Sequence, residues 1–228
     1  MKINSLSFVI GGEAVAGINL AGFILGKSFV RGGLNVFGTI DYQSLIRGGH
    51  NAYYATVDTS EVYTHSGYAD LLLALNEETI YIHKHELVEG SGIVYDGESI
   101  DISAEKLGVK NVKLYSVPLR RIVKELQGPP VMKNTVAIGA AVSLVGYDLE
   151  LVNELIRETS GKEEKRLELN LAAAKRGYEY AEQNYKNDFD RKVEVLSRAK
   201  NKMFITGSDA IGLGAIKAGC KFYAAYPN

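Results

Sequence analysis

Short apolar runs of strand length, separated by helical or polar segments, recur through the first half of the chain. They are Ser5–Ile10, Leu34–Gly38, Ala52–Val57, Asp70–Leu75, Ile93–Tyr95 and Lys113–Val117. The run DLLLAL at 70–75 is apolar without alternation after its first residue, which is typical of a parallel strand buried on both faces. Strands that alternate with helices favour an α/β fold. We therefore expect a three-layer sandwich around a mostly parallel sheet.

The pattern becomes helical after the last of these runs. Helices are predicted at 119–127 and 132–145, and Asp148 is a typical N-cap for a third helix that ends near Ser160. Six apolar residues spaced four and three apart then predict a long helix with one apolar face. They are Leu167, Leu171, Ala174, Tyr178, Ala181 and Tyr185. Plain packing against a larger body explains this face.

The composition changes again near the C-terminal end. Residues 186–202 are charged and poor in large apolar side chains, so we expect a linker or a bridging helix. Residues 203–228 have the pattern of strand, helix and strand, with Ser208 as the predicted N-cap and Cys220 as a small buried hydrophobe. A complete domain needs roughly 50 residues. We therefore expect one domain over 1–185 and the truncated start of a second α/β domain.

Charge and cysteine content exclude several classes of function. Lys and Arg together number 26 and Asp and Glu 27, so no overall charge favours nucleic acid or an acidic membrane surface. One cysteine excludes a disulfide framework and any cysteine-ligated iron–sulfur cluster or zinc site within these 228 residues. Residues 1–10 show no signal-peptide pattern, and polar residues and glycines interrupt the apolar stretch 14–30. We expect a cytoplasmic protein that does not span a membrane.

Two glycine-containing segments are candidates for ligand binding. Gly11-Gly12, predicted between a strand and a helix, is a position where phosphate can rest on helix amides. The full dinucleotide fingerprint is absent, however, and a tight turn with close helix–sheet packing is the alternative. In the loop 41–51, Arg47 precedes Gly48-Gly49 and could pair with phosphate or carboxylate. A β-turn with a solvated arginine is the alternative there.

The remaining polar residues give no catalytic pattern. His83, His85 and Glu86 lack a third spaced ligand, and we expect a solvated helix face rather than a metal site. No Ser-His-Asp set and no pair of carboxylates stands out, so we assign no catalytic residue and no metal to this chain.

Several stretches resemble a known family. The stretch IGGEAVAGINLAGFILGKSFVRGGLNVFGTIDYQSLIRGGHNAYYATV resembles the opening of the gamma domain of the 2-oxoacid:ferredoxin oxidoreductases. The resemblance continues through DLLLALNEETI, GIVYDG, NTVAIGAAVSLVGYDLELVNELI and NLAAAKRGYEYA, and covers residues 5–185. TGSDAIGLGAIKAGCKFYAAYPN resembles the start of the alpha, or pyrimidine-binding, domain, in which Tyr226-Pro227 would begin a motif that handles the oxoacid and thiamine.

The resemblance implies a subunit of a complex that decarboxylates a 2-oxoacid such as pyruvate or 2-oxoglutarate, reduces ferredoxin and forms acyl-coenzyme A. Thiamine diphosphate, Mg and a 4Fe-4S cluster would belong to the full complex, with a beta subunit as partner, and none would be bound by this chain alone. The gamma domain would pack against the catalytic domains and help to enclose coenzyme A. The candidate contacts for coenzyme A are Gly11, Gly12, Ser44, Arg47, Gly48, Gly49 and Asn51.

Two alternatives remain open from the residues themselves. One is a stand-alone nucleotide-binding or regulatory module, and the other is a purely structural docking domain. The apparent start of a second domain favours a subunit fragment that oligomerises, because a self-sufficient module would not need to begin another sheet.

Overall fold

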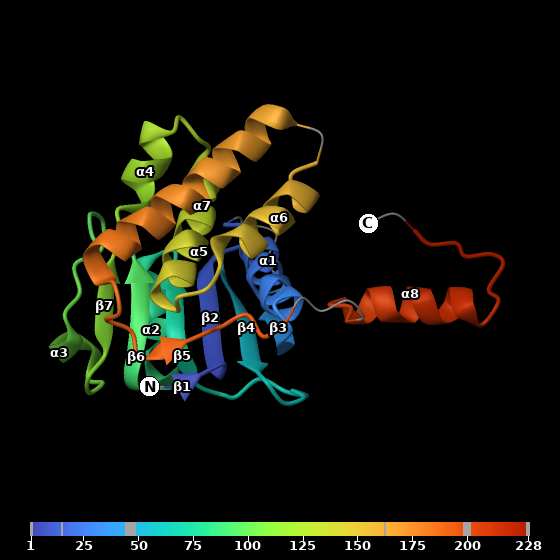
Figure 1. The fold of residues 1–228 in the computed structure, drawn as a ribbon, viewed down its shortest axis with the longest axis horizontal. Coiled ribbons are helices and arrows are strands. Elements are labelled where there is room, and N and C mark those ends of the chain that lie inside the picture. Colours follow the sequence, from blue (N-terminus) through green and yellow to red (C-terminus); the bar gives the residue numbers. More distant parts are fainter. Residues whose placement is uncertain (1, 15, 44–48, 162, 198–201, 227–228) are drawn as a thin grey trace.

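A computed structural model describes residues 2–14, 16–43, 49–161, 163–197 and 202–226 (Figure 1). The strands are β1 (Lys2–Ile3), β2 (Leu6–Glu13), β3 (Asn35–Asp41), β4 (His50–Asp58), β5 (Ala69–Ala74), β6 (Leu87–Tyr95), β7 (Lys113–Ser116) and β8 (Arg191–Lys192). The helices are α1 (Ile18–Arg31), α2 (Glu77–His83), α3 (Ala104–Leu107), α4 (Leu119–Glu125), α5 (Lys133–Leu144), α6 (Leu149–Thr159), α7 (Glu164–Tyr185) and α8 (Gly207–Lys217). Two 3₁₀ turns, η1 (Lys84–Glu86) and η2 (Pro130–Met132), complete the description.

The main sheet has six strands in the order β3-β4-β2-β5-β6-β7. The pairs β2–β5, β5–β6 and β6–β7 are parallel, whereas β3–β4 and β4–β2 are antiparallel. The prediction of a mostly parallel sheet is therefore confirmed. The direction changes between β4 and β2, so the start of β4 lies beside the carboxyl end of β2.

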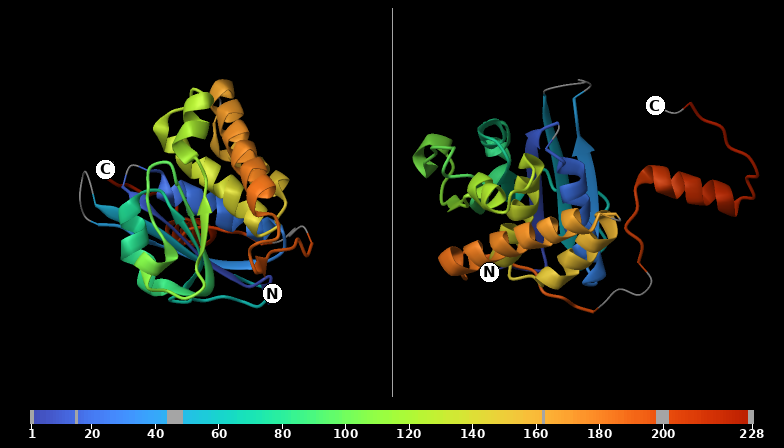
Figure 2. Two further views of the ribbon diagram at one scale, coloured as in Figure 1. Left: turned by 90° about the vertical axis from the view of Figure 1, so that its left-hand side faces the viewer. Right: turned by 90° about the horizontal axis from the view of Figure 1, so that it is seen from above.

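Helices cover both faces of this sheet and give the expected three layers (Figures 1 and 2). The helices α1, α4, α5, α6 and α7 form a thick layer on one face, and their side chains share a core with Phe8, Ile10 and Leu73. The short helices α2 and α3 form a thin layer on the other face, over Leu72 and Ile93. Because apolar side chains project from both faces of the central strands into the core, those strands are continuous apolar runs in the sequence.

The helices α5 and α7 cross with their backbones in direct contact. A Cβ atom built on Gly139 would lie 2.0 Å from the carbonyl oxygen of Ala174, and one built on Gly177 would lie 2.0 Å from that of Val136. The predicted apolar face of α7 supplies this contact, with Ala174 and Ala181 buried. The two glycines therefore allow the outer helix to approach the layer beneath it.

The segment predicted as a linker or bridging helix forms no helix in its described part, residues 186–197, and its role as a linker stays a prediction. Residues 186–190 form turns and bends, β8 pairs with β1 in parallel, and the side chains of Phe189 and Val193 are buried. The sequence shows too few apolar residues for a helix with its own apolar face, but two large ones suffice to fill a gap beside the sheet. The segment thus packs on the first domain. The boundary at residue 185 stays a prediction.

The C-terminal segment contains the predicted helix but neither predicted strand. Residues 203–206 and 222–226 form no strand, because no neighbouring strand is there to satisfy their backbone groups. The N-cap of α8 is Thr206, which forms a capping box with Asp209, and not Ser208. Cys220 is exposed, so the prediction of a buried cysteine is wrong. Helix α8 projects away from the rest of the molecule (Figures 1 and 2).

No helix among the described residues is both long enough and apolar enough to cross a bilayer.

Candidate functional site

The carboxyl end of β2 and the start of β4 bring several predicted site residues together. In the antiparallel ladder Gly11 lies opposite Ala52, Gly12 opposite Asn51, and Glu13 opposite His50. Gly49 precedes β4 and has a φ of +83°, in the left-handed region that favours glycine. Ser44, Arg47 and Gly48 lie outside the described residues, as does Pro227. Tyr226 is exposed on the C-terminal segment.

Gly11 and Gly12 lie within strand β2 rather than in a turn between strand and helix. A Cβ on Gly11 would lie 2.5 Å from Cγ2 of Thr79, and one on Gly12 would lie 3.1 Å from Cβ of Leu75. Both glycines therefore permit the close packing that the sequence offered as the alternative to ligand binding. The turn into α1 is made further on by Gly17, whose φ is +69°. A ligand role for Gly11 and Gly12 stays a prediction.

Charged residues that the sequence reasoning missed gather near the carboxyl ends of the neighbouring strands. Nζ of Lys133 donates a hydrogen bond to the carbonyl oxygen of Leu75 at 2.8 Å. Burial lowers the pKa of Lys133, and the nearby Arg120 cation lowers it further. Asp96 follows β6 and accepts a hydrogen bond from the backbone N–H of Arg120 at 3.1 Å. The position of Asp96 directly after a buried strand was a sequence signal for this site, because ligands of open α/β sheets bind at the carboxyl edge of the strands.

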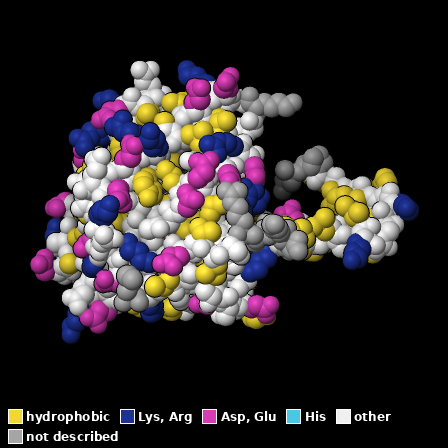
Figure 3. Space-filling view, in the orientation of Figure 1, with side chains coloured by type: hydrophobic (Ala, Val, Ile, Leu, Met, Phe, Trp, Pro, Cys, Tyr) yellow, Lys and Arg dark blue, Asp and Glu magenta, His cyan; other side chains and the backbone are white. Residues whose placement is uncertain are grey.

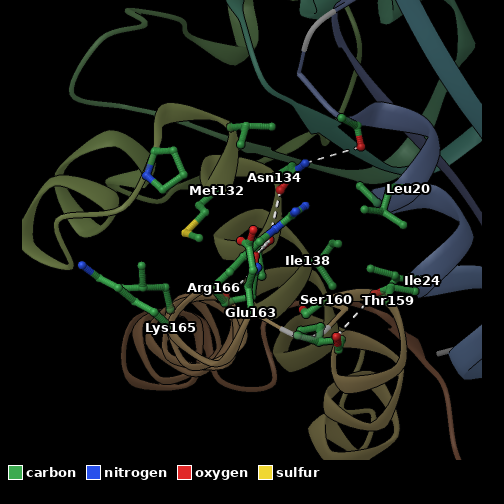
Figure 4. A pocket seen from close by; sticks show the side chains of 18 of the residues that line it. Leu20, Ile24, Met132, Asn134, Ile138, Thr159, Ser160, Glu163, Lys165 and Arg166 are labelled. Carbon is green, nitrogen blue, oxygen red and sulfur yellow. Dashed lines mark hydrogen bonds between the residues drawn. The ribbon is translucent and has the colours of Figure 1, made fainter.

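An apolar cavity of about 790 Å³ opens on the helical side of the same edge (Figure 4). Four helix ends meet there: the first turns of α1, α5 and α7 and the last turn of α6. Leu20, Ile24, Met132 and Ile138 contribute apolar surface, and the side chains of Lys165 and Arg166 lie at its charged part. The sequence gives no local signal for this cavity, because each helix contributes only a few residues to it.

Asn134 joins the cavity to the carboxyl edge. Its side-chain nitrogen donates a hydrogen bond to the carbonyl oxygen of Ala16 at 2.9 Å, and its oxygen accepts one from Thr135 at 3.0 Å (Figure 4). Asn134 thereby fixes the turn that leads into α1 at one end of the cavity. The cavity has the size and the mostly apolar character of small-molecule sites.

The prediction that His83, His85 and Glu86 form a solvated helix face is wrong for His83. Its exposed fraction is 1%, whereas the side chain of His85 is 72% exposed. Helix α2 ends at His83, which turns inward under β4, so His83 and His85 no longer belong to one helix face. Nε2 of His83 lies 2.7 Å from Nε2 of His50, and Nδ1 lies 2.9 Å from Oε2 of Glu86.

The described residues do not fit the metal groups of an oxidoreductase complex. They contain no group of three or more His, Cys, Asp or Glu side chains placed to hold a metal ion. A 4Fe-4S cluster requires several thiolates, and the 228 residues contain one cysteine.

The family model described as pyruvate ferredoxin/flavodoxin oxidoreductase matches residues 7–180. The chain belongs to this family. Similar proteins include subunit alpha of 2-oxoacid:ferredoxin oxidoreductase 2 from Aeropyrum pernix, which is 24% identical over 97% of this chain and 41% of its own length. Another is the 2-oxoglutarate synthase subunit KorC from Methanocaldococcus jannaschii, 29% identical over 50% of this chain and 59% of its own.

Solved structures of this family share the fold. The 2-oxoglutarate:ferredoxin oxidoreductase from Magnetococcus marinus, with 2-oxoglutarate, coenzyme A and succinyl-CoA bound, matches with a TM-score of 0.87 and 28% identity. That match covers 98% of this chain and 39% of the other. The keto/oxoacid ferredoxin oxidoreductase gamma subunit from Geobacter sulfurreducens matches with a TM-score of 0.65 and 23% identity, over 77% of this chain and 98% of its own. The chain thus spans about two fifths of the Aeropyrum and Magnetococcus family members.

Proposed function

We propose that this chain is part of a 2-oxoacid:ferredoxin oxidoreductase and comprises its gamma domain and the start of its alpha domain. The complex would oxidatively decarboxylate a 2-oxoacid, such as pyruvate or 2-oxoglutarate, to acyl-coenzyme A and reduce ferredoxin. The difference in coverage carries this proposal. A complete gamma subunit accounts for 77% of the chain, whereas the longer Magnetococcus chain accounts for 98%.

The role of this chain would be to pack against the catalytic domains and to enclose coenzyme A. Coenzyme A combines a phosphorylated nucleotide with a long uncharged arm. The edge formed by Gly12, Gly49 and Asn51 offers backbone groups and an amide to the nucleotide, and Arg47 lies two positions before Gly49 in the sequence. The apolar cavity beside Gly17 supports the binding of part of this uncharged arm.

The remaining chemistry belongs to other parts of the complex. Thiamine diphosphate, Mg and a 4Fe-4S cluster would be held by the beta subunit and by the rest of the alpha domain, with ferredoxin as the electron acceptor. The assembly would work in the cytoplasm. This chain alone would have no turnover with a 2-oxoacid, thiamine diphosphate and a dye acceptor, and turnover by the isolated chain would refute the proposal.

Arg47→Ala in the full complex tests the coenzyme A role. A charge-assisted hydrogen bond contributes about 1.5–3 kcal/mol, so the apparent KM for coenzyme A should rise tenfold or more. Reduction of the acceptor in the absence of coenzyme A should change little, because decarboxylation occurs elsewhere. Arg47→Lys should recover only part of the loss, since an ammonium group lacks the planar fork. An unchanged KM with a lowered melting temperature would show that Arg47 only braces its loop.

A further inference from the structure

A chain of hydrogen bonds fastens the thin layer to the sheet at the start of β4. It runs from Oε2 of Glu86 to Nδ1 of His83 at 2.9 Å, and from Nε2 of His83 to Nε2 of His50 at 2.7 Å. Glu86 and His83 belong to η1 and α2, whereas His50 is the first residue of β4. The two imidazole rings have centroids 4.9 Å apart. The proposed enclosure of coenzyme A does not involve this contact.

The surroundings hold the two rings in place. Gly11 lacks a Cβ atom, and one built there would lie 2.9 Å from Cε1 of His50. Tyr54 packs edge-on against the His83 ring and donates a hydrogen bond to Oε1 of Glu86 at 3.4 Å. Nδ1 of His50 is buried and has no hydrogen-bond partner among the described residues. The contact between the rings is therefore partly buried and confined by its neighbours.

The number of hydrogens on the ring nitrogens limits the protonation states that this geometry allows. A carboxylate only accepts hydrogen bonds, so Nδ1 of His83 carries a hydrogen. One further hydrogen can lie between the two Nε2 atoms, donated by either ring. If both rings were imidazolium ions, two N–H groups would point at each other across 2.7 Å, with like charges. The closed arrangement therefore accepts one imidazolium ion and excludes a second.

We propose that the His50–His83 contact is a pH-sensitive latch, which holds α2 on the start of β4 and opens when both imidazoles are protonated. Opening would loosen the edge of the sheet at which Gly12 and Asn51 lie. Any effect on coenzyme A rests on the proposed function, whereas the opening itself does not. Measuring the opening directly therefore separates the two proposals.

The charges around His50 set the direction of its response to pH. Burial lowers the pKa of His50, and the neighbouring His83 lowers it further; Glu78 on α2, Asp41 on β3 and Glu86 on η1 oppose this. A histidine with a lowered pKa in the folded state binds protons more readily when unfolded. Its contribution to stability is complete above the ordinary pKa of about 6.5 and is lost as the pH falls through the folded value.

Nuclear magnetic resonance of the ¹⁵N-labelled full chain tests the latch. Side-chain nitrogen spectra between pH 8 and 5 report the protonation state of each imidazole ring. His50 should take up its proton below the ordinary histidine pKa of about 6.5, and protection of the α2 amides from exchange should fall at least tenfold at the pH where both rings become charged. Double protonation with unchanged α2 protection would overturn the proposal, as would loss of that protection at a pH where one of the two rings is still neutral.

A variant gives an independent measurement. His50→Gln retains hydrogen-bonding groups but cannot become charged, so it should remove the acid-dependent loss of stability. In the natural chain the folding equilibrium constant should fall by up to about tenfold for each unit by which the folded pKa lies below 6.5. His85→Gln, in the same segment but exposed, should behave like the natural chain. An equal acid-dependent loss of stability in all three proteins would overturn the latch. If His50→Gln does not fold, the spectra of the natural chain decide between the two outcomes.

Discussion

Asp70 lies almost fully buried at the second position of strand β5, where a charged residue is costly unless it is paired. One carboxylate oxygen accepts a hydrogen bond from the backbone N–H of Ser7 at 3.0 Å, and the other accepts one from Nε of Arg191 at 2.9 Å. A single side chain thus joins the centre of the sheet to the segment that follows α7. At the residue scale, buried polar partners of this kind determine where distant parts of the chain meet.

We expect Asp70→Ala to destabilise the protein by about 3–5 kcal/mol, because it leaves a largely buried Arg191 without its carboxylate. Asp101→Ala is a matched control, since the side chain of Asp101 is 99% exposed. That substitution should change stability by less than about 0.5 kcal/mol. Urea unfolding of both variants measures the difference, and similar midpoints for the two would contradict the importance of the pair.

Among the elements, the crossing of α5 and α7 depends most directly on the absence of side chains. One glycine on each helix, Gly139 on α5 and Gly177 on α7, allows backbone contact. The surrounding residues are small and buried: Ala140, Ala141, Ala173 and Ala174. The long helix α7 can therefore lie flat across the layer beneath it. Helix α8 has glycines too, but no neighbouring atom lies within 4 Å of a Cβ built on Gly212.

Gly139→Ala should therefore destabilise the folded core by about 1–3 kcal/mol, since the added methyl group forces the two helices apart. Gly212→Ala is the matched control, because it adds the same methyl group to an exposed helix. It should leave the unfolding of the core unchanged and raise the helicity of α8. Near-ultraviolet circular dichroism during unfolding reports on the core. A Gly139→Ala midpoint equal to that of the natural chain would show that the crossing relaxes without cost.

At the scale of the whole molecule, the chain consists of a layered body and a projecting C-terminal segment. Hydrophobic side chains remain exposed on the projection, and Met203, Ile211, Ile216, Phe222 and Tyr223 are each more than 70% exposed (Figure 3). The ring of Phe204 lies 5.4 Å from that of Phe23 on α1, which anchors the start of this segment. An exposed apolar surface of this kind is typical of an interface.

Limited digestion with trypsin should separate these two parts. Cleavage is expected after Lys217 and Lys221, which are exposed, and after Lys202. Lys192 should resist, because β8 is paired and its neighbour Val193 is buried. Mass spectrometry of the stable product should therefore show a fragment that extends past residue 193. A stable fragment that ends near Lys186 would mean that the segment after α7 does not pack as described.

The sequence by itself determined the order and type of the main elements. Continuous apolar runs such as 70–75 predict buried parallel strands, and the spacing from Leu167 to Tyr185 predicts a long helix, because both patterns are local and periodic. The family could also be predicted, since it is carried by contiguous stretches such as the one that contains Gly11 and Gly12. For the candidate site, the sequence singled out Gly12 and Asn51, which the structure places opposite each other and whose ligand role stays a prediction, but missed Lys133, Asp96 and the apolar cavity.

Only the tertiary structure decided which isolated residues meet. His50 and His83 are 33 positions apart, and Asp70 and Arg191 are 121 apart, so no local pattern links either pair. The segment after α7 packs on the first domain because Phe189 and Val193 fill a space that other elements create, and residues 203–206 and 222–226 form no strand because a strand requires a neighbour. Periodicity reports which face of an element is buried, whereas the identity of the partner depends on how the elements assemble.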